Sequence, residues 1–80
     1  MSTLFALPIR IERTETGGYL ATSDALPGFL VEGETMEDVY GQAPVVAREL
    51  LEAYRQLDMP LPARLQPVSE EFSLYVLVAA

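Results

Sequence analysis

The stretch from residue 26 to residue 39 constrains the fold most, because it packs a turn, a short strand, a second turn and a helix start into fourteen residues. Pro27 presets the backbone for the first corner of a turn, and Gly28 supplies the positive φ of the second. Thr35 followed by Asp38 predicts a helix cap, since the hydroxyl accepts from a free backbone amide and the carboxylate reaches back. We therefore assign structural roles to the turn and cap residues Pro27, Gly28, Gly33 and Thr35.

Three strands are predicted before the helix. Residues 4–13 alternate with period two, which indicates a half-buried strand, and its apolar side is formed by Phe5, Leu7, Ile9 and Ile11. Pro8 cannot donate a ladder hydrogen bond, so it lies at an edge, at a bulge or near the true strand start. A Gly-Gly turn and a second short loop then connect strands at 19–23 and 29–32. Loops this short favour an antiparallel meander.

From Met36 the apolar period changes to that of a helix of about 22 residues. The predicted apolar face consists of Met36, Val39, Tyr40, Ala43, Val46, Ala47, Leu50, Tyr54 and Leu57. Pro44 conflicts with this helix, because an interior proline removes a hydrogen bond and clashes with the preceding turn. We expect either a kink at Pro44 or a regular helix that starts near that residue.

Residues 58–67 carry three prolines and are predicted to be an extended connector. Residues 72–78 are predicted to form the last strand, with apolar side chains on both faces. The sequence therefore predicts a single domain over residues 1–80. Its class is α+β, with the element order β-β-β-α-β and one amphipathic helix packed on one face of a small antiparallel sheet. Since one helix covers one face only, we expect a homo-oligomer, a dimer or higher, with Tyr75 and Leu77 in the interface.

Twelve carboxylates against five arginines, with no lysine or histidine, give a net charge of −7. Phosphate backbones repel such a surface, so we expect no direct nucleic-acid contact. A basic protein partner is favoured instead, because opposite charge speeds association. There is no cysteine, no secretory pattern and no apolar stretch long enough to cross a bilayer. We expect a cytoplasmic protein without membrane contact.

The missing residue types also restrict the chemistry. Without His, Cys or Lys there is no Ser-His-Asp triad, no thiolate nucleophile, no Schiff base and no imidazole ligand. Only carboxylates, hydroxyls and arginines remain for catalysis, and we expect no catalytic residue, no cofactor and no metal. The acidic residues around the predicted helix start are the candidate contacts for a basic partner: Glu32, Glu34, Glu37 and Asp38.

Two other interpretations of these carboxylates stay open. Negative side chains at a helix start interact favourably with the helix dipole, so capping accounts for Glu37 and Asp38 at least. Asp24 with Glu32 and Glu34 is a conceivable oxygen-ligand set for a hard cation, although Asp24 also suits a turn.

The chain resembles the HicB-like antitoxin family. The resemblance is carried by Leu26-Pro27-Gly28, by Gly33-Glu34-Thr35-Met36-Glu37-Asp38-Val39, by the Gly18-Tyr19 hairpin, and by the amphipathic helix and proline-containing connector that follow. It implies a partial RNase H-like fold and a non-enzymatic protein that neutralises a small basic mRNA-cleaving toxin, HicA, by masking its surface. If the resemblance holds, we expect the short form of the family, without the C-terminal DNA-binding segment that fuller antitoxins add. Asp24-Ala25 stands where the family often has Pro-Asp.

The leading expectation is thus a protein-binding module of the HicB-like antitoxin kind. One alternative, which also comes from the RNase H-like resemblance, is a remnant of a carboxylate-metal phosphodiesterase. The other is an orphan dimeric ligand-binding or scaffold module.

Overall fold

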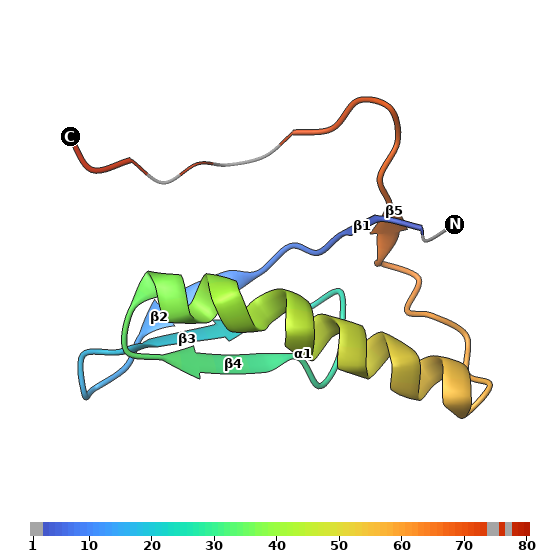
Figure 1. Cartoon of the computed structure of the whole chain (residues 1–80), viewed down its shortest axis with the longest axis horizontal. Coiled ribbons are helices and arrows are strands. Elements are labelled where there is room, and N and C mark those ends of the chain that lie inside the picture. Colours follow the sequence, from blue (N-terminus) through green and yellow to red (C-terminus); the bar gives the residue numbers. More distant parts are fainter. Residues whose placement is uncertain (1–2, 74–75, 77) are drawn as a thin grey trace.

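The chain forms an α+β domain in which one long helix lies across a three-stranded antiparallel sheet (Figure 1). The structure, a computed structural model, describes residues 3–73, 76 and 78–80. Its elements are β1 (Phe5–Ala6), β2 (Arg10–Arg13), β3 (Tyr19–Thr22), β4 (Leu30–Gly33), α1 (Met36–Gln56) and β5 (Gln66–Pro67). The predicted class is confirmed, and the predicted element order differs only in that the first strand is divided into β1 and β2.

The sheet has the order β2-β3-β4, and its register aligns Ile11, Ala21 and Val31 across the three strands. Helix α1 packs over this face, because successive strand residues alternate sides and these are the apolar ones. The buried core cluster consists of Ala21, Leu26, Phe29, Val31 and Val39. The sheet therefore has one covered face, as predicted.

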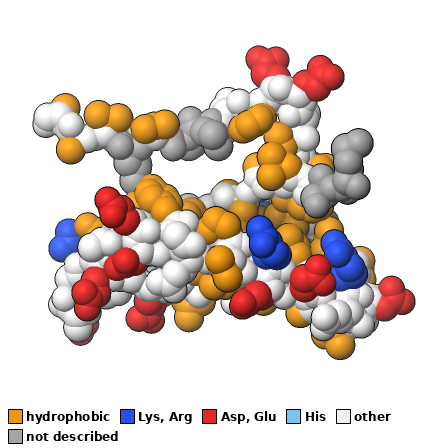
Figure 2. All heavy atoms as spheres, viewed as in Figure 1, with side chains coloured by type: hydrophobic (Ala, Val, Ile, Leu, Met, Phe, Trp, Pro, Cys, Tyr) orange, Lys and Arg blue, Asp and Glu red, His pale blue; other side chains and the backbone are white. Residues whose placement is uncertain are grey.

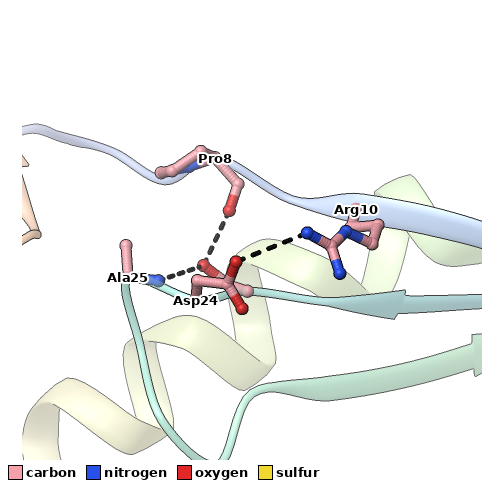
Figure 3. A network of polar contacts seen from close by, with 5 residues as sticks. Pro8, Arg10, Asp24 and Ala25 are labelled. Carbon is pink, nitrogen blue, oxygen red and sulfur yellow. Dashed lines mark hydrogen bonds and ion pairs between the residues drawn. The ribbon is translucent and has the colours of Figure 1, made fainter.

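The first strand shows the predicted alternation, since Phe5, Leu7, Ile9 and Ile11 are all half-buried. It is interrupted at Pro8, where the chain is tied to the end of β3 (Figure 3). The Ser23 hydroxyl donates to the Pro8 carbonyl oxygen at 2.6 Å and accepts from the Ala25 amide at 3.2 Å. Arg10 and Asp24 form an exposed ion pair at 3.5 Å beside it (Figure 3). Hydrogen bonds from outside the ladder thus hold the break in place.

Helix α1 begins at the predicted cap. The Asp38 amide donates to Thr35 Oγ1 at 3.1 Å, and the Thr35 amide donates to Asp38 Oδ2 at 3.2 Å, which completes a capping box. The helix continues through Pro44, so the alternative that regular helix starts near that residue is wrong. Most of the predicted apolar face is buried or half-buried, but Leu57 is 69% exposed, because it follows the last helical turn.

The position predicted for the last strand is wrong for the residues that can be judged. Residues 72, 73, 76 and 78 have no strand pairing, and the predicted interface residues Tyr75 and Leu77 lie outside the described residues. Instead β5 pairs antiparallel with β1, and the Val68 amide donates to the Leu4 carbonyl at 2.7 Å. The alternation of apolar residues predicts which faces of a strand are buried but not which strand it pairs with. Here the strand that pairs with β1 is Gln66–Pro67, at the end of the proline-containing connector. Of the described residues, none belongs to a helix long and apolar enough to span a membrane.

Candidate functional site

An open recess lies where the β2–β3 hairpin turn meets the end of β4. The antiparallel register pairs Tyr19 with Gly33, so residues far apart in the chain come together at this edge. A Cβ on Gly18 would lie 2.8 Å from the Gly33 carbonyl oxygen, which is closer than real Cβ contacts. Gly17 has φ 88°, the left-handed conformation that glycine adopts without strain. Glycine at these positions therefore lets the turn pack against β4.

The recess has a volume of about 470 Å³ and a polar lining: Thr14, Thr16, Gly17, Gly18, Tyr19, Glu32, Gly33 and Glu34. The hydroxyls of Thr14 and Thr16 are 3.1 Å apart, and Thr14 Oγ1 also accepts from the Gly18 amide at 3.0 Å. These bonds order one wall of the recess. Glu32 and Glu34 supply two carboxylates on the other wall, and both are exposed.

The four predicted partner contacts divide into two groups. Glu32 and Glu34 line the recess, and Glu37 is exposed in the first turn of α1 just beyond it. Asp38 has a structural role, because its carboxylate is engaged in the capping box. The side-chain amide of Gln42 donates to the Glu32 carbonyl at 3.4 Å, which ties the helix to β4 beside the recess. Three of the four carboxylates are thus available at one corner.

The charge at this corner is not neutralised within the part of the chain that the structure describes. The described residues form two ion pairs, Arg10–Asp24 and Arg55–Glu52. Neither pair includes a glutamate of the recess. The guanidinium of Arg13 lies 5.1 Å from the centre of the Tyr19 ring, a cation–π contact. An ionised carboxylate accepts hydrogen bonds but donates none. Two carboxylates side by side therefore suit the N–H donors of an arginine or lysine side chain. The recess is chemically suited to a cationic donor group.

The conceivable cation-binding set is not brought together. Asp24 lies two residues beyond the end of β3, whereas Glu34 directly follows the last residue of the antiparallel strand β4. These two positions lie at opposite ends of the sheet, and Asp24 is paired with Arg10. Among residues 3–73, 76 and 78–80, no three acidic, histidine or cysteine side chains are grouped so that they could hold a metal ion.

Two of the recess residues were not anticipated from the sequence. Thr14 and Thr16 belong to a hairpin turn, and turn composition accounts for them without any site. The strand register is the signal that points to these two residues. Pairing Tyr19 with Gly33 at the end of β4 places the hairpin turn beside Glu34. That register follows only once both hairpin loops are fixed.

These features define a class: a small α+β domain with a three-stranded antiparallel sheet, a single covering helix and an acidic corner at the helix start. A family model described as a domain of unknown function (DUF1902) matches residues 7–76. The chain therefore belongs to the DUF1902 family. No curated protein and no solved structure matches the chain.

Proposed function

We propose that this protein is a non-enzymatic binding module of the HicB-like antitoxin kind, which holds a small basic protein against its acidic corner. The observation that carries the proposal is the succession of three exposed carboxylates, Glu32, Glu34 and Glu37, along the end of β4 and the first turn of α1. Two of them, Glu32 and Glu34, line the same recess. The resemblance of residues 26–39 to HicB-like antitoxins supplies the partner class, a basic mRNA-cleaving toxin.

The charge of the molecule supports such a partner. With a net charge of −7, the domain attracts a cationic protein over about a Debye length, close to 8 Å at physiological ionic strength. Steering of this kind raises the association rate more than it slows dissociation. We therefore expect fast association that slows markedly with added salt.

The recess adds specificity to this general attraction. Its two carboxylates and two ordered hydroxyls form a group of acceptors into which one arginine or lysine side chain of the partner would project. The carboxylates are positioned by the end of β4, and the hydroxyls by hydrogen bonds within the β2–β3 hairpin turn. A single inserted cation at such a site is the expected anchor of the interface.

The test starts from the adjacent genes: one of them should encode a small, strongly basic protein, and binding of that protein is then measured by calorimetry at two salt concentrations. The double variant Glu34→Lys with Glu37→Lys should weaken binding by about 100-fold, since rim and pocket charge pairs at protein interfaces contribute on the order of 1–3 kcal/mol. Helix content should stay unchanged, because both side chains are exposed and neither belongs to the capping box.

A matched control is Glu70→Lys with Glu71→Lys. Each substitution changes the charge by two units, so both double variants carry −3 instead of −7. Residues 70 and 71 are exposed and lie beyond β5, in a different part of the fold. If both double variants lose affinity equally, net charge alone drives binding and the acidic corner is not the contact. If neither loses affinity, the electrostatic proposal fails altogether.

A further inference from the structure

A second surface, distinct from the acidic corner, is an apolar groove between the N-terminal strand run and α1. It has a volume of about 900 Å³ and is lined by sixteen residues, which include Leu4, Phe5 and Leu7 on one side and Tyr40 and Leu51 on the other. Leu4 is 69% exposed and Tyr40 is 48% exposed. An exposed apolar groove in a small domain indicates a surface that is covered by something else.

The C-terminal segment carries matching chemistry. Residues 72–80 contain no charged side chain, and their described large apolar residues Phe72, Val76 and Val78 are 52%, 81% and 78% exposed. Figure 2 shows hydrophobic side chains on the described residues of this segment, at a distance from the body of the molecule. An uncharged, alternating apolar segment left in water is an aggregation hazard. Like the groove, the segment requires a cover.

The described residues of the segment, 72, 73, 76 and 78–80, do not line the groove of their own chain. The Val68 amide is bound to the Leu4 carbonyl, and the Ser69 hydroxyl donates to the Glu71 carbonyl at 2.7 Å, so the chain turns directly after β5. In Figure 1 the N-terminal strand run lies between the returning C-terminal segment and α1. The segment and the groove of one chain are therefore on opposite sides of β1.

We propose that two copies of this chain exchange their C-terminal segments, each segment filling the groove of the other copy. The thirteen residues from 68 to 80 reach about 43 Å when extended, enough to cross a molecule whose longest dimension is 40 Å. Each chain then contributes nine segment residues and the fourteen groove residues that are not buried, which makes 23. That number falls within the roughly 20–30 residues a side of a standard interface. Reciprocal exchange closes the assembly at two copies.

This inference does not depend on the proposed antitoxin function, because the groove and the acidic corner are separate surfaces. The first experiment is light scattering after size exclusion at micromolar concentration. The chain mass is 8.8 kDa, so the exchanged dimer has about twice that mass. The double variant Val76→Glu with Val78→Glu should raise the dimer dissociation constant by about tenfold or more for each charge, because a buried carboxylate without a partner is costly.

The groove side is tested with Leu4→Glu, which should weaken the dimer in the same way. The side chain of Leu4 is largely exposed in the single chain, so the variant should keep its fold, measured as an unchanged circular dichroism spectrum. The matched control is Val45→Glu, which is 54% exposed on α1 but does not line the groove. It should leave the dimer unchanged.

Exchange between chains is shown directly by mixing two single-cysteine variants, since the natural sequence has no cysteine. Val76→Cys in one chain should crosslink through a bismaleimide to Arg48→Cys in the other, since Arg48 lines the groove, and not to Glu34→Cys at the acidic corner. A monomer, a dimer that survives either glutamate test, or equal crosslinking at positions 34 and 48 would overturn the proposal.

Discussion

Replacing Gly33 with alanine should destabilise the domain by displacing the start of α1. An added Cβ at this position would lie 2.7 Å from Asp38 Cβ, 3.2 Å from the Val39 amide nitrogen and 3.3 Å from the Thr35 carbonyl oxygen. The first of these distances is too short for any real contact, and all three neighbours belong to the capped first turn. None of them is the far end of a flexible side chain. The helix start must therefore move away from β4.

The size of the effect follows from two contributions. Overpacking of a tight contact costs about 1–3 kcal/mol. Moving Asp38 also disturbs the capping box, whose loss costs about 1 kcal/mol. Together they lower the free energy of unfolding by about 2–4 kcal/mol, which corresponds to a drop of roughly 10 °C or more in the unfolding midpoint of a domain this small.

Gly41→Ala is the matched control, because it makes the same chemical change with the opposite expected sign. Gly41 is exposed within α1, and a Cβ there meets nothing within 4 Å. Alanine in a helix interior is favoured over glycine by about 0.5–1 kcal/mol. Urea unfolding followed by circular dichroism at one protein concentration measures both variants. A change below about 0.5 kcal/mol for Gly33→Ala, or a shift of both variants in the same direction, would refute the steric reasoning.

Three further substitutions test other contacts by the same unfolding assay. Thr35→Ala should cost about 1 kcal/mol through the lost cap, and Thr35→Ser should restore most of it. Leu26→Ala, at a fully buried position, should cost about 2–5 kcal/mol, whereas Leu30→Ala at a half-exposed position should cost clearly less; similar losses would contradict the assigned core. Pro44→Ala should stabilise the helix by about 1–3 kcal/mol, and a destabilised variant would show that the proline is needed for packing.

The elements that the sequence predicts correctly are those fixed by local chemistry. The alternation of Phe5, Leu7, Ile9 and Ile11 needs only the period of a strand, and the cap at Thr35 needs only a residue three positions later. The break that divides the first strand was not predicted, although Pro8, whose missing amide hydrogen cannot join a regular ladder, was identified as the irregular position. Each of these features is decided within a few residues.

The features that the sequence does not predict depend on distant partners. The pairing of Gln66–Pro67 with Phe5–Ala6 joins opposite ends of the chain, and no local pattern distinguishes it from a pairing by residues 72–78. The same holds for the recess, where the acidic residues were foreseen but Thr14 and Thr16 were not. The two threonines lie near the glutamates only because of the register between β3 and β4. The alternation of apolar residues along a strand does not determine that register.

The tie between β1 and β5 has a kinetic consequence. It closes a loop of roughly sixty residues, an entropic cost that grows with loop length, and it rests on only two pairs of residues. The meander and the helix, by contrast, join segments that are close in the chain and form quickly. Amide hydrogens of this tie should therefore exchange with solvent long before those of β3. The wall of the apolar groove is thus the last part of the domain to assemble and the first to open.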